Sequence, residues 1–251
     1  MPADIVLAAD ERLDEVNESL VLIQKKNALA FGTDAFLLSA FLRPATRERA
    51  VELGCGNGII SLLAATRGRF SQVTAVEIQE EMAALAARNV VYNRLEDRVT
   101  VLTKDVRCLS SATLGGEVGV VFANPPYMRT DSGAVSPYSA KDIARHETEG
   151  GIEEFAAAAA RCLKYGGLFY TVYRPDRLET LFAALKAHKL APKRMVLVQD
   201  HPEAAPSMVL LESKLGAAEG LVLLPTLLLH ERRGDKALSP RAAAIYETGT
   251  F

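Results

Sequence analysis

The chain has 251 residues, of which 49% are hydrophobic and 24% charged, a composition that fits one large α/β domain or two small ones. Its net charge of −2 argues against a protein that coats nucleic acid by charge, although it allows a local basic patch. No apolar run approaches the roughly 18 residues of a membrane span, and the N-terminus lacks a signal-peptide pattern. The 3 cysteines and 4 histidines show no metal-ligand spacing. These features predict a cytoplasmic protein without a membrane segment or a bound metal.

Residues 1–45 are predicted to form an N-terminal helical cap, and residues 46–251 a second domain. The stretch TDAFLLSAFL contains apolar residues at helical spacing, with Thr33 as its N-cap. We therefore expect at least one helix before Pro44.

After Pro44 the sequence alternates between apolar strand segments and helical segments. Alternating strands and helices predict a parallel sheet with helices on both faces. The predicted strands are 50–53, 73–78, 99–102, 118–123 and 168–173, and the predicted helices are 59–67, 80–92, 153–163 and 176–188.

The helix over 153–163 is expected to stop at Gly166-Gly167. Two later apolar runs, 195–199 and 208–215, have no helix between them and predict an antiparallel pair at one sheet edge. The predicted fold class is therefore α/β and Rossmann-like: a mostly parallel seven-stranded sheet with an antiparallel C-terminal edge and helices on both faces.

A glycine-rich stretch, ELGCGNG, joins the first predicted strand to the first helix after Pro44 and contains Gly54, Gly56 and Gly58. Glycines at such a turn let the backbone approach a ligand closely, although tight turns use glycine for steric reasons as well. Glu77 ends the second strand, about 20 residues after the last of these glycines, the offset expected for a carboxylate that binds a ribose. Asp105 ends the third strand at the same edge. Each acid has helix capping or solvation as its alternative, but the ordered set favours a nucleoside-type cofactor.

The fourth predicted strand ends in NPPY, which places Asn124 at the same edge of the sheet. Pro125 and Pro126 fix the backbone and provide no N–H donor. The corner therefore offers two acceptors, the side-chain oxygen of Asn124 and the carbonyl of Pro125, which suit a planar NH2 group. Tyr127 adds a face on which a ring could stack, worth about 1–3 kcal/mol per base. The alternative is a simple strand-ending turn.

VELGCGNGI, AVEI, TKD and NPPY, in this order and spacing, resemble the class I S-adenosylmethionine-dependent methyltransferases that methylate amino groups. FGTDAFLLSAF and RNVVYN narrow the resemblance to the bacterial tRNA1(Val) adenine-37 N6-methyltransferase family, over about residues 20–250. The resemblance implies S-adenosyl-L-methionine as cofactor and a methyltransferase domain over 46–251. Its implied cofactor-binding residues are Thr33, Asp34, Glu52, Gly54, Gly56, Gly58, Glu77, Asp105, Val106 and Asn124.

Within that resemblance, Glu77 would bind the ribose hydroxyls and Asp105 the adenine amino group of the cofactor. Asn124 and Pro125 would hold the target nitrogen, and Tyr127 the target ring. The implied activity is N-methylation of an exocyclic amino group, with adenine N6 in tRNA as the first expectation.

Alternatives to this activity stay open. A protein glutamine N5-methyltransferase or a ribosomal RNA base N-methyltransferase could use the same NPPY corner. A nicotinamide-dependent oxidoreductase shares the glycine–acid layout but leaves NPPY unexplained, and a methyltransferase-like binding module without activity is a further alternative. The partner is expected to be nucleic acid, with monomer and dimer both open. The residues considered as RNA contacts are Lys25-Lys26, Arg129, Lys141, Arg145, Lys193-Arg194 and Arg232-Arg233, together with the loop over 128–151.

Overall fold

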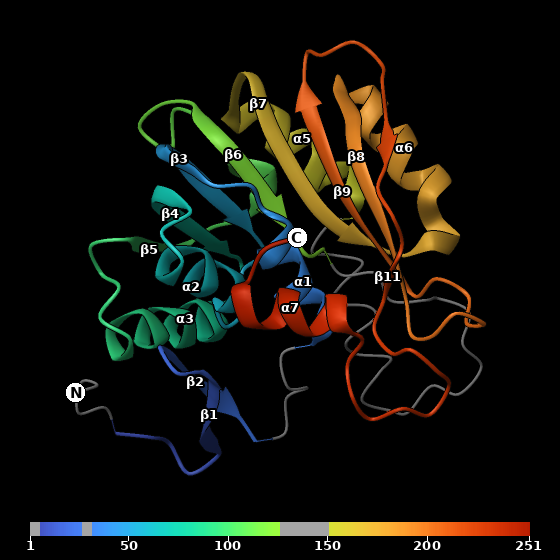
Figure 1. Cartoon of the computed structure of the whole chain (residues 1–251). Helices are drawn as coiled ribbons and strands as arrows, with labels where there is room; N and C mark the ends of the chain where they lie inside the picture. The colour runs from blue at the N-terminus through green and yellow to red at the C-terminus, as the bar shows by residue number, and fades with distance from the viewer. Residues whose placement is uncertain (1–5, 27–31, 126–150) are drawn as a thin grey trace, which may run out of the picture.

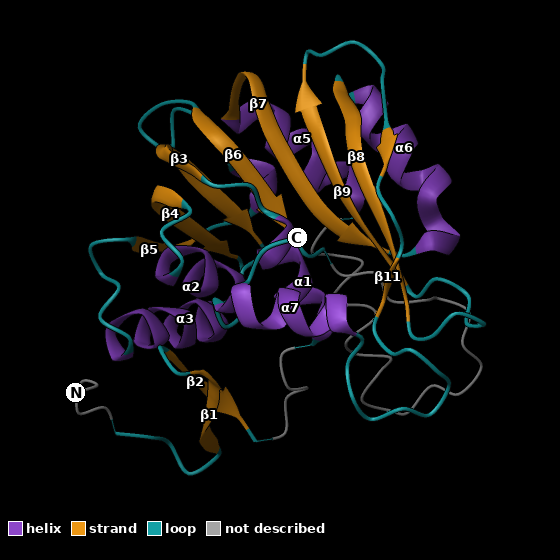
Figure 2. Ribbon diagram, viewed as in Figure 1, coloured by secondary structure: helices purple, strands orange, loops and turns teal. Residues whose placement is uncertain are grey.

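A central sheet with helices on both faces forms the body of the protein, seen in a computed structural model that describes residues 6–26, 32–125 and 151–251 (Figure 1, Figure 2). The strands of this sheet in the described residues are β3 (Ala45–Leu53), β4 (Phe70–Glu77), β5 (Val99–Thr103), β6 (Val118–Ala123), β7 (Leu163–Tyr173), β8 (Leu190–Gln199), β9 (Met208–Leu215), β10 (Val222–Leu223) and β11 (Leu227–Leu228). The α-helices among these residues are α1 (Thr33–Phe41), α2 (Ile59–Thr66), α3 (Glu80–Tyr92), α5 (Ile152–Cys162), α6 (Leu178–Ala187) and α7 (Pro240–Thr248).

The strand order confirms the predicted fold class. The seven longer strands lie in the order β8-β9-β7-β6-β3-β4-β5, and β3 to β7 pair in parallel. Strand β9 lies between β7 and β8 and is antiparallel to both. The predicted antiparallel pair is formed by β8 and β9. It does not form the edge of the sheet, because the short strands β10 and β11 pair with the outer side of β8.

Strand β6 shows how the sheet builds two cores, because all of its residues are buried. Val120 and Phe122 pack toward α1 and α2, whereas Val121 and Ala123 pack toward α5 and α6. Alternating side chains of a parallel strand point to opposite faces, and both faces here carry helices. The apolar sequence of β6 follows from this double burial.

The N-terminal segment differs from the prediction of a helical cap. Strands β1 (Glu11–Asn17) and β2 (Leu20–Lys25) form a separate antiparallel hairpin, so the expectation of helix is wrong there. Asn17 closes the turn by accepting a hydrogen bond from the Ser19 N–H at 2.9 Å. Helix α1 is confirmed, but its N-cap is Gly32, and α1 packs on the main sheet. The division of the chain at residue 45 stays a prediction.

Helix α5 ends at Cys162, so the predicted stop at Gly166-Gly167 is wrong. The backbone from Leu163 onward pairs with β6, and this pairing takes those residues into β7. Within the described residues, no helix has the length and hydropathy needed to cross a membrane.

Candidate active site

The glycine loop, residues 54–58, joins β3 to α2 at the carboxyl end of the parallel strands. Gly56 has φ +54° and Gly58 φ +87°, backbone conformations that L side chains rarely adopt. A Cβ on Gly58 would lie 3.3 Å from the Ala86 Cβ of α3, whereas one on Gly56 would meet no atom within 4 Å. Gly58 therefore serves helix packing, and Gly56 faces open space where a ligand can approach the backbone.

Glu77 ends β4 directly beside this loop. The Gly56 N–H donates to its Oε2 at 2.8 Å, and the Gln79 N–H donates to its Oε1 at 3.0 Å. The Glu77 side chain is only 5% exposed, and these two bonds fix the orientation of its carboxylate. Each carboxylate oxygen has two lone-pair sites, so both can still accept a hydroxyl. The position next to Gly56 and the remaining acceptor capacity fit a ribose diol.

Asp105 follows β5 and caps the 3-10 turn Val106–Cys108. Its side chain accepts from the Arg107 N–H at 2.8 Å and forms an ion pair with the Arg107 Nη2 at 2.5 Å. The hydrogen bond from Arg107 lowers the pKa of Asp105. The capping alternative for Asp105 is therefore confirmed, and an additional contact of Asp105 or the buried Val106 with a cofactor stays a prediction.

Glu52 lies inside β3 and is 1% exposed. Its Oε2 accepts from the backbone N–H of Ser61, at 2.9 Å, and from the Ser61 hydroxyl in the first turn of α2. Burial raises the pKa of Glu52 to about 8. The carboxyl group holds α2 against β3, and its direct contact with a cofactor stays a prediction.

Asn124 follows β6 and meets the start of α1 across the carboxyl edge of the sheet. Its Nδ2 donates to the Asp34 Oδ2 at 2.9 Å, between residues 90 positions apart. An ionised carboxylate only accepts hydrogen bonds, so this bond fixes the amide nitrogen toward α1 and turns the Asn124 Oδ1 the other way. Thr33 precedes Asp34 in α1, and Pro125 is buried beside Asn124.

The predicted residues come together because their strands are neighbours. The glycine loop follows β3, Glu77 ends β4, and Asp105 and Asn124 follow β5 and β6. These four strands lie side by side in the order β6-β3-β4-β5. The carboxyl ends of parallel strands meet at one edge, where ligands bind in open α/β sheets. Pro126, Tyr127 and the loop after them lie outside the described residues, as do Arg129, Lys141 and Arg145.

Sequence reasoning missed Asn89, a fully buried residue of α3. Its Nδ2 donates to the backbone carbonyl of Asn57 in the glycine loop at 3.0 Å. The stretch RNVVYN contained a signal, because Asn89 and Asn93 are four residues apart and so lie on one face of the helix.

Four of the basic residues considered as RNA contacts make side-chain contacts within the protein. Lys26 donates to the Ala9 carbonyl at 2.7 Å, and Lys193 donates to the Ala218 carbonyl. Lys25 pairs with Asp10 and Glu81, at 2.9 and 3.1 Å. Arg194 pairs with Glu212 at 2.8 Å and lies over the Phe41 ring. Arg232 and Arg233 are exposed, so they stay candidates for contact with a polyanion.

Comparison with known sequences places the chain among methyltransferases. The family model described as "Methyltransferase small domain" matches residues 25–190. A tRNA1(Val) (adenine(37)-N6)-methyltransferase from Bacteroides fragilis (strain YCH46) is 31% identical over 181 residues, covering 72% of this chain and 75% of the relative. The protein of the same name from Dyadobacter fermentans is 31% identical over 184 residues, covering 72% of this chain and 74% of the relative.

Solved structures share the fold. A predicted O-methyltransferase, Atu636 of Agrobacterium tumefaciens, superposes with a TM-score of 0.68 at 22% identity, covering 87% of this chain and 97% of that one. The M. jannaschii TYW2 protein, solved in complex with AdoMet, gives a TM-score of 0.56 at 13% identity, covering 84% and 88%. The chain thus shares its overall fold with these two proteins.

Proposed function

Because this chain belongs to the methyltransferase small domain family and is an S-adenosylmethionine-dependent methyltransferase, we propose that it methylates the N6 amino group of an adenine in tRNA. The observation that carries the proposal is the position of Asn124, held by Asp34 at the carboxyl end of β6 and on the same sheet edge as the glycine loop. The names of the relatives support tRNA as the substrate. A tRNA substrate is consistent with a cytoplasmic location.

The residues at this edge fit the cofactor. Gly56 leaves open space over the loop, Glu77 has acceptor capacity for the ribose hydroxyls, and Asp105 lies at the end of the next strand for the adenine amino group. Bound S-adenosylmethionine supplies a methyl group on a sulfonium centre. The task of the protein is then to align an amine with that methyl group.

Asn124 and Pro125 perform the alignment on the substrate side. The Asn124 Oδ1 and the Pro125 carbonyl accept the two hydrogens of the target amine, which turns its nitrogen lone pair away from the ring system and toward the methyl group. Asp34 acts as a positioning residue, since its bond to Nδ2 keeps Oδ1 aimed at the substrate. Neutral acceptors are sufficient because transfer to nitrogen depends on orientation above all.

The first experiment measures transfer of tritium from labelled S-adenosylmethionine to total tRNA, ribosomal RNA and ribosomal proteins in parallel. We expect label in tRNA as N6-methyladenosine. Asn124→Ala should lower the rate by about 100-fold or more, as loss of a preorganised polar group does in other active sites. Label in ribosomal RNA or in protein glutamine instead would contradict the tRNA proposal and favour the corresponding alternative.

Asp34 variants test the positioning role in the same assay. Asp34→Ala should lower kcat about tenfold, which corresponds to about 1.4 kcal/mol and to one hydrogen bond. Asp34→Asn keeps an oxygen that accepts from the Asn124 Nδ2, so it should recover most of the rate. Equal losses in the two variants would show that Asp34 acts through its charge and not through the orientation of Asn124.

A further inference from the structure

The β1–β2 hairpin is attached to α3 by side-chain amides that act like a neighbouring strand. Asn89 accepts from the Ile23 N–H at 2.7 Å and donates to the Ile23 carbonyl at 3.1 Å. Asn93, one helical turn later, forms the same pair of bonds with Val21, at 3.0 and 2.7 Å. Two asparagines thus satisfy the outward-facing backbone groups of β2, which would otherwise be an open sheet edge.

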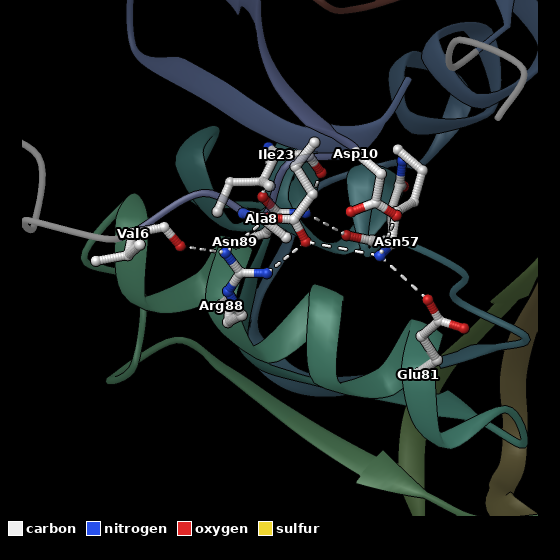
Figure 3. A network of polar contacts seen from close by, with 10 residues as sticks. Val6, Ala8, Asp10, Ile23, Asn57, Glu81, Arg88 and Asn89 are labelled. Atoms are coloured by element: carbon white, nitrogen blue, oxygen red, sulfur yellow. Dashed lines mark hydrogen bonds and ion pairs between the residues drawn. The ribbon is translucent and has the colours of Figure 1, made fainter. Parts of the chain in front are cut away.

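Charged groups hold the same hairpin against α3 (Figure 3). Arg88 donates from Nη1 to the Glu11 Oε1 at 2.6 Å and from Nη2 to the Glu11 Oε2 at 2.9 Å. The hydrogen bond from Arg88 lowers the pKa of Glu11 to about 2. Lys25 reaches across to Glu81 at the start of α3. The hairpin therefore has a fixed position relative to α3.

The Nδ2 of each asparagine also donates a second hydrogen bond, and the two differ in its acceptor. For Asn93 the acceptor is the Asn89 carbonyl within the same helical turn, at 2.8 Å, whereas for Asn89 it is the Asn57 carbonyl in the glycine loop, at 3.0 Å. One buried amide therefore contacts both the hairpin and the loop, as Figure 3 shows for Ile23, Asn89 and Asn57. Gln24 of β2 adds a longer contact, 3.5 Å from its Oε1 to the Asn57 Nδ2.

The hydrogen bond from Asn89 restrains the peptide unit between Asn57 and Gly58. Asn57 lies between two glycines with positive φ, and glycine dihedrals rotate with little steric cost. The peptide that joins Asn57 to Gly58 is held at its carbonyl by Asn89 and at its N–H by the Cys55 carbonyl, at 2.8 Å. Without Asn89, the carbonyl loses this partner, and the peptide is held only at its N–H.

We propose that Asn89 is a positioning residue for S-adenosylmethionine, which ties the N-terminal hairpin to the glycine loop and presets the loop for the cofactor. The inference concerns the cofactor and is independent of which amine receives the methyl group. Preset loops bind more tightly because less conformational freedom is lost on binding. The hairpin is thereby part of the cofactor site although it contributes no residue to the glycine loop.

The test compares Asn89→Ala with Asn93→Ala by calorimetric titration of S-adenosylmethionine. Each variant removes two bonds to β2, but only Asn89→Ala removes the bond to the loop. We expect the Kd for the cofactor to rise roughly tenfold in Asn89→Ala, the effect of one hydrogen bond, and to stay within about twofold in Asn93→Ala. Hydrogen exchange at the Gly58 amide should accelerate in the first variant and not in the second.

Both variants are measured at a temperature at which circular dichroism shows them folded. If Asn89→Ala does not fold, Asn89→Asp takes its place, because it keeps the acceptor for the Ile23 N–H and removes the donor to the Asn57 and Ile23 carbonyls. Equal changes of Kd in the Asn89 and Asn93 variants, or an unchanged Kd in the Asn89 variant, would overturn the proposal. Since no methyl acceptor is present, this result is separate from the outcome of the tRNA assay.

Discussion

Glu52 is a single residue whose burial makes stability depend on pH. Its carboxyl group ionises in the unfolded chain near 4.5 but has a pKa of about 8 in the folded protein, because burial disfavours the charged form and Glu77 adds like charge. The hydrogen bonds from Ser61 offset only part of this effect. Between these two pH values the unfolded chain releases a proton that the folded chain retains.

The free energy of unfolding should therefore fall as pH rises from 5 to 8 in a way that depends on Glu52. The stabilising contribution is fully present below the unfolded pKa and is lost as pH rises through the folded one. Glu52→Gln keeps an oxygen that accepts from Ser61 but cannot titrate. Urea unfolding of both proteins at pH 5 and pH 8 should show the variant gaining stability relative to wild type at the higher pH; parallel profiles would contradict the assignment.

At the scale of elements, Arg69 joins the ends of α1 and α7. It is 2% exposed, and its guanidinium donates to the carbonyls of Ala40 and Leu42, at the end of α1, and of Gly249, at the end of α7. Burial lowers the pKa of Arg69 to about 10, so it stays charged at neutral pH. The last carbonyls of a helix have no partner within the helix and favour a cation.

Replacing Arg69 should loosen the C-terminal helix. Arg69→Met keeps an unbranched apolar stem but removes the guanidinium and leaves three carbonyls without their donor, so we expect a loss of about 3 kcal/mol in the free energy of unfolding. Hydrogen exchange should show faster exchange of the α7 amides. Arg241→Met is the matched control: Arg241 also binds two backbone carbonyls but is exposed, and its loss should cost less than about 1 kcal/mol. Similar losses in both variants would contradict the role of Arg69.

At the scale of the whole molecule, the net charge of −2 limits how a polyanion is bound. Lys25 and Arg194 already pair with carboxylates of the protein. If tRNA is the substrate, its recognition depends on a few phosphate contacts and on the base at Asn124. A plot of log affinity against log salt should have a slope between about −1 and −3, since each neutralised phosphate adds about −0.7 to −0.9. Filter binding at several salt concentrations measures the slope, and one steeper than about −5 would contradict this reasoning.

The strand–helix rhythm after Pro44 and the cluster of Gly56, Glu77 and Asn124 could be predicted from sequence because local patterns carry them. Apolar runs mark buried strands, and strands of one parallel sheet end at one edge. The hairpin over 11–25 was missed although β1 alternates in burial and Asn17 marks a turn.

The contacts Asp34–Asn124 and Asn89–Asn57 could not be predicted from sequence. Each joins residues far apart in the chain, 90 and 32 positions respectively, and no local pattern specifies the partner. Both become visible only when the packing of α1 and α3 on the sheet is known. Side-chain amides are especially hard to assign, because asparagine serves equally well in turns, caps and solvent-exposed positions.

The place of β9 between β7 and β8 has a consequence for synthesis on the ribosome. The two outer partners precede β9 in the chain, so they leave the exit tunnel first and cannot pair with each other in their final positions. Until residues 208–215 emerge, both strands keep an open edge, and such edges invite pairing with other chains. The nascent protein thus passes through a stage in which its sheet has a gap one strand wide. Strand β9 closes this gap from within, and only the short strands β10 and β11 join the sheet after it.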